Sequence, residues 1–342
     1  MIASDGRRGF ITAGTWCVDR NKLIEFWPEE DSICNILSEE RRNGGSGSNL
    51  AIDMKKLDPS MPVETIGLVG DDDDGRFLIA EADAYGIGRS RLAVSNAAPT
   101  HYTECFGSKR TGRRTHMSFG GVGALLSPDH FDFSGSSARI LHLGLPGEHK
   151  TMDGPWQGEP NGWVAVLKKA RAAGLMTNLE LVSVTAEKIA ALVRPCLPLL
   201  DLLVVNDHEI GAIAGEKTVT PHGADPEACL RAARRVLAEG AMQIVVVHFP
   251  RGALALTRAG EPARKPSFRV PASEIVGANG AGDAFAAGFL YGFHEGWTLE
   301  QSLALGHAAA GASLRGISTT GTVETWQRCL ELATAWGPGE PI

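Results

Sequence analysis

The stretch VGANGAGDAF, residues 276–285, joins a turn of small residues to a carboxylate at the start of an apolar run. Gly280, Ala281 and Gly282 leave their backbone N–H groups uncovered, and the first turn of a helix adds unpaired donors and a positive dipole end. Such a turn attracts an anion, most commonly phosphate. Asp283 would repel phosphate, so it fits another task, which is to remove a proton from a hydroxyl group that attacks phosphorus. A tight turn followed by an ordinary Asp cap is the alternative, and these residues alone leave both open.

Composition restricts the class of protein. The chain has 342 residues, of which 43% are hydrophobic and 21% charged, as in an ordinary globular protein. The net charge of −7 argues against a partner such as nucleic acid or an anionic membrane, because Lys and Arg hold those partners. No apolar run reaches transmembrane length. The scattered cysteines and the absence of an apolar N-terminal segment indicate reduced thiols and a cytoplasmic protein.

Short apolar runs alternate with helical patterns, which is typical of a parallel sheet covered by helices. Strands are predicted at residues 10–18, 63–70, 138–144, 174–181, 200–206, 242–249 and 253–257. Helical patterns occupy residues 75–86, 163–174, 227–240 and 301–314. Residues 20–42 and 100–119 break this rhythm, and the second segment alternates around a glycine-containing turn like an antiparallel hairpin. We interpret both segments as a lid across the main sheet, with Lys109, Arg110, Arg113 and Arg114 at a solvated hairpin tip.

Three further motifs precede GAGDAF: NGGSGSNLA at 43–51, GLVGDDDDG at 67–75 and VVNDHEI at 204–210. In this order, the four motifs resemble the signatures of the ribokinase-like (PfkB) carbohydrate kinase family, over roughly residues 10–316. The resemblance implies an α/β fold, a three-layer α/β/α sandwich with a mostly parallel central sheet and a small β-sheet lid. Residues 1–342 would form a single domain with lid segments at about 18–42 and 98–120. The resemblance also implies a homodimer in which the lids of the two chains contact each other.

The resemblance further implies an ATP-dependent phosphotransferase that acts on a hydroxyl group of a sugar or sugar-like molecule. Asp283 would be the general base, and Gly280, Ala281 and Gly282 would form the anion hole. The residues expected to bind the sugar are Asp19, Gly44, Gly45 and Asn49. Those expected to bind the nucleotide are Asn206, Glu209, Gly252 and Asn279, with Asn206 and Glu209 also organising Mg²⁺ through water.

Two departures from the family pattern affect these expectations. Gly277 and Ala278 stand where the family usually has Asp-Thr, and the missing Asp argues against activation by a monovalent cation such as potassium. The Phe249-Pro250 step replaces a usual Leu-Gly and removes one N–H donor beside the nucleotide. These losses support an alternative function, a catalytically idle sensor that binds a sugar or nucleotide. A dehydrogenase is disfavoured because no G-x-G-x-x-G turn follows the first strand.

Several of these residues also fit structural roles. Asn206 and Glu209 fit a helix cap. The acidic run 71–74 is interpreted as a solvated turn rather than a metal site. The histidines at 116, 142 and 248 are interpreted as structural, and Trp16 and Trp27 fit either the sugar site or packing. The acceptor stays open among ribose, fructose, a ketodeoxy sugar acid and a nucleoside.

Overall fold

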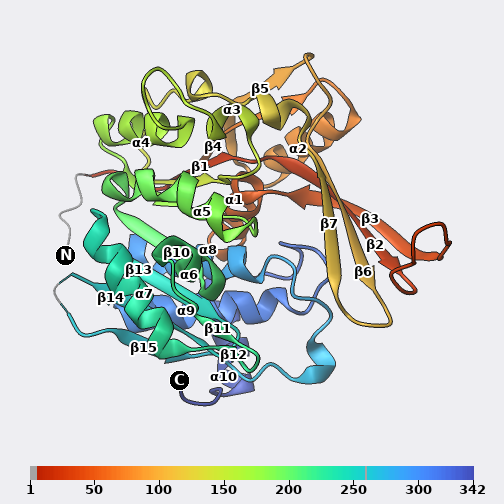
Figure 1. Ribbon diagram of the computed structural model, residues 1–342, viewed down its shortest axis with the longest axis vertical. Helices are drawn as coiled ribbons and strands as arrows, with labels where there is room; N and C mark the ends of the chain where they lie inside the picture. The colour runs from red at the N-terminus through yellow and green to blue at the C-terminus, as the bar shows by residue number, and fades with distance from the viewer. Residues whose placement is uncertain (1–5, 259) are drawn as a thin grey trace.

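The computed structural model describes residues 6–258 and 260–342, and its main feature is a nine-stranded sheet (Figure 1). The strand order is β15-β14-β13-β10-β9-β8-β1-β4-β5. All pairs from β13 to β5 are parallel, and β14 and β15 add antiparallel at one edge. These strands are β1 (Phe10–Gly14), β4 (Val63–Gly70), β5 (Gly88–Ser95), β8 (Ile140–Gly144), β9 (Met176–Leu179), β10 (Leu202–Asn206), β13 (Ile244–Phe249), β14 (Gly252–Thr257) and β15 (Ala263–Pro266).

Helices cover both faces of this sheet. Alternate residues of a strand point to opposite faces, so Val245 and Val246 belong to two different hydrophobic cores. One core packs against α4 (Gly162–Ala172), α5 (Ala186–Val193), α6 (Asp207–Ala214) and α7 (Pro226–Glu239), with the short α3 (Lys150–Asp153) beside them. The other packs against α1 (Ser46–Leu57), α2 (Asp73–Ala84), α8 (Ala281–His294), α9 (Leu299–Ser313) and α10 (Trp326–Trp336). The predicted three-layer α/β/α sandwich is confirmed.

A second, four-stranded sheet projects from one side of the molecule (Figure 1). It has the order β3-β2-β6-β7, from β2 (Cys17–Ile24), β3 (Ile36–Gly44), β6 (Tyr102–Ser108) and β7 (Arg114–Phe119), and we call it the lid. Its two outer pairs are antiparallel, and β2 and β6 pair in parallel. A separate two-stranded sheet, of β11 (Val219–Thr220) and β12 (Gly223–Ala224), is formed by the segment between α6 and α7.

The predicted strand at 10–18 is in fact divided between the two sheets. The chain leaves the central sheet after Gly14 and enters the lid at Cys17. Trp16, between them, is 1% exposed and donates from its indole nitrogen to Thr65 Oγ1 at 2.7 Å. Its indole therefore belongs to the core.

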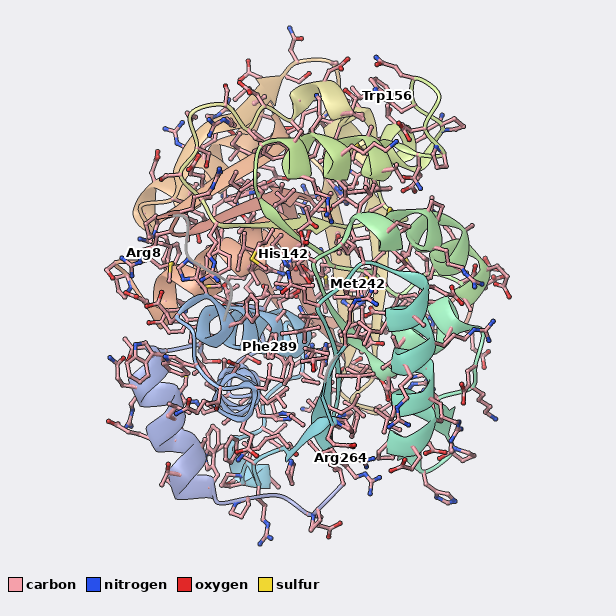
Figure 2. The ribbon with its side chains drawn as sticks, turned by 90° about the vertical axis from the view of Figure 1, so that its left-hand side faces the viewer. Arg8, His142, Trp156, Met242, Arg264 and Phe289 are labelled. Carbon is pink, nitrogen blue, oxygen red and sulfur yellow. The ribbon has the colours of Figure 1, made fainter. Side chains whose placement is uncertain are left out.

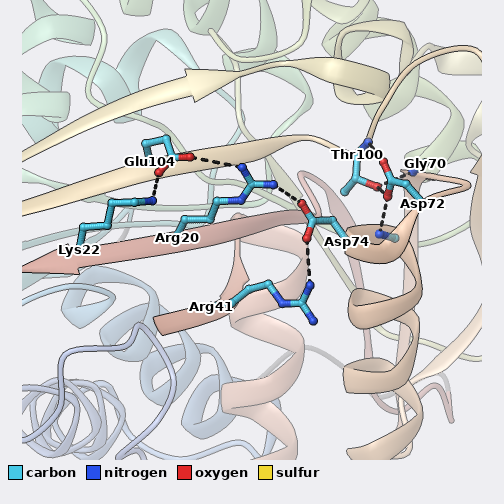
Figure 3. Close-up of polar contacts among 9 residues, drawn as sticks. Arg20, Lys22, Arg41, Gly70, Asp72, Asp74, Thr100 and Glu104 are labelled. Atoms are coloured by element: carbon cyan, nitrogen blue, oxygen red, sulfur yellow. Dashed lines mark hydrogen bonds and ion pairs between the residues drawn. The ribbon is translucent and has the colours of Figure 1, made fainter. Parts of the chain in front are cut away.

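Ion pairs fasten the lid to α2 (Figure 3). The carboxylate of Asp74 accepts from Arg20 at 2.7 Å and from Arg41 at 3.2 Å. Glu104, on the neighbouring strand, accepts from Arg20 at 3.3 Å and also bonds Lys22. The acidic run was expected to be a solvated turn, and for Asp74 this is wrong because the lid supplies its partners.

Asp72 also departs from that expectation. Its carboxylate caps α2 by accepting from the backbone N–H of Gly75 at 2.8 Å, and it accepts from the backbone N–H of Thr100 at 2.8 Å. The hydroxyl of Thr100 donates to it at 2.6 Å. The start of α2 is thereby joined to the segment that leads into β6.

Two strands of the central sheet were not predicted, β5 and β15. Both lie at the sheet's edges, where one side of each strand has no partner and the apolar alternation is weak.

The six cysteines, all within the described residues, are free thiols. Over residues 6–258 and 260–342, no helix combines the length and the apolar character needed to cross a membrane.

Candidate active site

The glycine-rich turn forms the start of α8, as predicted. Gly280 precedes this helix with φ of 74°, in the left-handed region that glycine adopts without strain. A Cβ atom at this position would lie 2.3 Å from the carbonyl oxygen of Thr319, so the close backbone contact also requires glycine. Because Gly280 has no side chain, it cannot cap the first amides of the helix. Ala281 and Gly282 border a cavity of about 160 Å³.

Asp283 borders the same cavity and is held by a hydrogen-bond network. Asn49 of α1 donates from Nδ2 to Asp283 Oδ2 at 3.0 Å. The amide oxygen of Asn49 accepts from Asn43 Nδ2 at 3.0 Å and from Thr319 Oγ1 at 3.1 Å. These two bonds orient the amide so that its N–H group points at the carboxylate. Asn49, predicted as a sugar ligand, orients Asp283 in this structure.

Glu180, which the sequence reasoning missed, contacts Asp283. It directly follows β9, and the two carboxyl groups are hydrogen-bonded. Behind it, His142 Nε2 bonds Glu180 Oε2, and Asn178 Nδ2 lies 3.0 Å from His142 Nδ1. Since the Asn178 amide donates to Nδ1, His142 is a neutral imidazole whose Nε2–H donates to Glu180. His142 is 0% exposed, and its label lies near the middle of the view in Figure 2. It is therefore buried, as predicted, but it also adjoins the site through Glu180.

Burial and charge both favour protonation of this carboxyl pair. Burial, followed by the charge and hydrogen bond of Glu180, raises the pKa of Asp283 well above its usual range, although Asn49 and His142 oppose the shift. Burial raises the pKa of Glu180 to about 7. Two adjacent carboxyl groups do not ionise independently. The pair therefore takes up a proton at a pH well above the range of an isolated carboxyl group.

Asn206 and Glu209 border the same cavity as Asp283 and form a capping box at the start of α6. Asn206 Oδ1 accepts from the backbone N–H of Glu209, and Glu209 Oε2 accepts from that of Asn206, both at 2.9 Å. The structural interpretation of this pair is therefore correct, and the box uses Oδ1 of Asn206 and only one of the two carboxylate oxygens of Glu209. Burial raises the pKa of Glu209 to about 7, with Asp283 as a further cause.

His248 also borders this cavity. Its ring stacks on Phe285 with the centroids 4.8 Å apart, and burial lowers the pKa of His248 to about 4, so the ring is neutral. A Cβ atom on Gly282 would lie 3.5 Å from the His248 ring. The sequence analysis interpreted His248 as purely structural and did not place it at the cavity. The one signal for this placement was that residues 248–250 depart from the family pattern.

Asp19 reaches the site from the lid. It is 7% exposed, and burial together with the charge of Asp283 raises the pKa of Asp19 to about 7. A Cβ atom on Gly44 would lie 2.3 Å from Asp19 Oδ1, so Gly44 makes room for this carboxyl group. Gly45 has φ of 86° and precedes α1, where a Cβ atom would meet Thr15 at 2.6 Å. Gly44 thus makes room within the lid itself, and Gly45 lets the start of α1 approach the chain between β1 and β2.

The other predicted residues also lie outside the cavity lining, as do the four expected to bind the sugar, Asp19, Gly44, Gly45 and Asn49. Gly252 begins β14 and packs under Ile342, whose Cδ1 would lie 2.6 Å from an added Cβ atom. Asn279 adjoins Gly280 but does not border the cavity. Trp27 is 44% exposed and contacts Phe106 edge-on. In the part of the chain that the structure describes, no three His, Cys, Asp or Glu side chains are grouped to hold a metal ion.

Comparison with known proteins identifies the fold and the family. The fold is that of solved ribokinases: the Giardia lamblia enzyme superposes with a TM-score of 0.78 at 20% identity, covering 95% of this chain and 99% of that one. Arabidopsis thaliana ribokinase, solved with ribose and ATP, gives a TM-score of 0.74 at 21% identity, covering 96% and 99%. The model described as "pfkB family carbohydrate kinase" matches residues 17–326. The chain belongs to the PfkB family of carbohydrate kinases.

Curated relatives are similar over nearly their whole length. The 5-dehydro-2-deoxygluconokinase of Geobacillus thermodenitrificans is 26% identical over 327 residues, which cover 92% of this chain and 90% of the relative. The enzyme of the same name from Shouchella clausii is 25% identical over 311 residues, covering 88% and 87%.

Proposed function

We propose that this carbohydrate kinase transfers the γ-phosphoryl group of ATP to a hydroxyl group of a sugar or sugar acid, with Asp283 as the general base. One observation carries this proposal. Asp283 and the uncapped amides of Ala281 and Gly282 border a single cavity at the start of α8. A group that accepts a proton therefore lies beside donors that stabilise negative charge.

In the proposed step, the acceptor oxygen attacks the γ-phosphorus, and the bond from this phosphorus to the β–γ bridging oxygen breaks. The hydroxyl proton passes to Asp283, and ADP leaves with the bonding electrons. The amides of residues 280–282 stabilise charge on the transferred group. Asn49 holds the Asp283 carboxylate in place, and burial together with Glu180 raises the pH at which it ionises. Closure of the lid excludes water, which would compete as acceptor.

Asn206 and Glu209 fit a role in holding Mg²⁺ through water. They border the cavity, and the capping box leaves each with further acceptor capacity. Magnesium keeps much of its hydration shell, which suits a site without a dense ligand cluster. When bound, the ion neutralises charge on the phosphates of ATP. Calorimetric measurement of ATP affinity at increasing Mg²⁺ concentration tests this role. Glu209→Gln should weaken the dependence of ATP affinity on Mg²⁺.

A sugar acid is the first acceptor to assay. The relatives named 5-dehydro-2-deoxygluconokinase support this choice, since the similarity extends over about nine tenths of this chain and of each relative. Coupled ADP release should be measured with 5-dehydro-2-deoxygluconate, ribose, fructose and nucleosides, and the product identified by ³¹P NMR. Acceptor-dependent ADP release with a phosphate monoester as product is expected. Ligand binding without turnover for every acceptor would favour the idle sensor instead.

A homodimer through the lid is the second part of the proposal. The edge strands β3 and β7 are open to pairing. The lid also carries much of the exposed apolar surface, at Leu23, Trp27, Ile33, Ile36, Leu37, Met117 and Phe119. Light scattering at micromolar concentration should give twice the mass of one chain, and Ile33→Asp, at a side chain that is 89% exposed, should lower it. A mass of one chain for the unmodified protein would contradict the dimer.

A further inference from the structure

The segment of residues 316–322, which follows α9 and which we call the support loop, packs against the glycine-rich turn. It has no regular secondary structure, yet Ser318, Thr319 and Thr320 are buried. Backbone groups in a buried irregular segment lack the partners that a helix or a sheet would supply. The carbonyl groups of the support loop therefore need donors from elsewhere in the fold.

Lys56, in the last turn of α1, supplies such donors. Its Nζ donates to the carbonyl oxygens of Thr320 and Gly321, at 2.6 and 2.8 Å. The Lys56 side chain is half-buried, and over residues 6–258 and 260–342 it forms no ion pair. Burial lowers the pKa of Lys56, and the charge of Asp53 opposes this shift. Because a half-buried ammonium group needs acceptors, the two carbonyl groups stabilise Lys56 as much as Lys56 stabilises the loop.

Thr319 connects the support loop to the proposed base. Its Oγ1 donates to Asn49 Oδ1 at 3.1 Å, and Asn49 Nδ2 donates to Asp283 Oδ2 at 3.0 Å. The oxygen and the nitrogen of an amide group turn together, so a bond to the oxygen also fixes where the N–H groups point. The position of Thr319 therefore affects the orientation of Asp283 through Asn49.

The backbone of Thr319 also contacts the start of the glycine-rich turn. A Cβ atom on Gly280 would lie 2.3 Å from the carbonyl oxygen of Thr319 and 2.6 Å from its Cα atom. Packing this close leaves no gap, so a shift of Thr319 changes the space that the turn occupies. Thr319 thus contacts both parts of the proposed catalytic site, the base through Asn49 and the anion hole through Gly280.

We propose that Lys56 is a positioning residue for phosphoryl transfer. By binding two carbonyl groups of the support loop, it holds Thr319 in contact with Asn49 and Gly280. The inference rests on the proposed kinase function and adds a residue that does not border the cavity. A displacement of about 1 Å at the reacting groups can lower turnover about 100-fold. Loss of Lys56 should therefore reduce kcat more than the affinity for either substrate.

Lys55, the preceding residue of α1, provides a matched control. Its Nζ also donates to two backbone carbonyl oxygens, those of Pro59 and Met61. These residues lie between α1 and β4, outside the support loop. The two lysines therefore make the same kind of contact with different segments. Their comparison separates the loss of a lysine–carbonyl contact from the loss of support for the site.

The test measures kcat and KM of Lys56→Met and Lys55→Met, with ATP and the acceptor that gives the fastest ADP release in the unmodified chain. Lys56→Met should lower kcat by about 10- to 100-fold and change both KM values only a few-fold. Lys55→Met should leave kcat unchanged. Equal kcat losses in the two variants, or a loss confined to KM, would overturn the positioning role. Should Lys56→Met unfold, Lys56→Gln keeps one amide donor and should lower kcat several-fold, and an unchanged kcat would count against the role.

Amide hydrogen exchange needs no turnover and separates this inference from the kinase function. Lys56→Met should speed exchange both in the support loop and at residues 281–285, whereas Lys55→Met should change neither. Faster exchange in the loop alone, or in neither segment, would show that Lys56 does not hold the turn. If no acceptor supports ADP release, the kinase function fails, but the exchange experiment still decides whether Lys56 positions residues 281–285.

Discussion

Replacement of Gly280 by alanine tests whether the glycine-rich turn is set by the backbone, as the structure indicates. The left-handed conformation costs an L-residue roughly 1–2 kcal/mol. The new Cβ atom would lie 2.3, 2.6 and 2.7 Å from the backbone O, Cα and C atoms of Thr319, so no rotamer change relieves the clash. Overpacking of this kind adds about 1–3 kcal/mol. Gly280→Ala should therefore lose about 2–5 kcal/mol of unfolding free energy, and its Tm should fall by roughly 3–7 °C for a chain of this length.

Gly282→Ala is the matched comparison, two residues further on. Its nearest neighbour would be the His248 ring at 3.5 Å, an ordinary contact, and the position is helical. Alanine here should leave Tm unchanged or raise it slightly, because it favours the helix over glycine. Turnover should fall nonetheless, since residue 282 borders the cavity that is proposed to bind the phosphates. Tm and the rate of ADP release should be measured for both variants. Equal Tm values for Gly280→Ala and Gly282→Ala would contradict the steric role assigned to Gly280.

Two further predictions concern the carboxyl pair and the attachment of the lid. In the unmodified chain, kcat/KM should fall as pH drops through the apparent pKa of the pair, because the base must be ionised to accept a proton. Glu180→Gln removes the neighbouring charge and should move this acidic limb to lower pH, so an unmoved limb in a pH–rate profile would count against the pairing. Asp74→Asn removes the ion pairs to Arg20 and Arg41 and should raise the acceptor KM a few-fold in steady-state assays, with little change in Tm. Asp73→Asn, at a side chain that is 91% exposed, is its control, and equal KM values for the two variants would contradict a role for Asp74 in lid closure.

The parts of the site that the sequence predicted are local. The turn before Asp283 and the capping box of Asn206 and Glu209 are each encoded within a few residues, by glycine and by cap chemistry. The alternation of strands and helices was likewise sufficient for the layered fold. Patterns of this kind need no knowledge of which segments meet in space.

The parts that were missed depend on contacts between distant segments. Glu180 and Asp283 come together only because the carboxyl end of β9, in the middle of the sheet, meets the start of α8. The one available signal was a carboxylate at the carboxyl end of a strand. Arg114 and Arg113 are indistinguishable by composition, and only the folded lid buries one of them. Asp74 was grouped with its acidic neighbours because its partners lie on the lid.

Asp283 is proposed to remove the proton of the acceptor hydroxyl group. The most direct measurement is the turnover of Asp283→Asn at saturating acceptor, with acceptor affinity determined on the same protein by calorimetry. A positioned general base contributes about 10²- to 10⁴-fold, so we expect kcat to fall by that factor while the acceptor still binds. A variant that keeps kcat within a few-fold of the unmodified chain would contradict the claim.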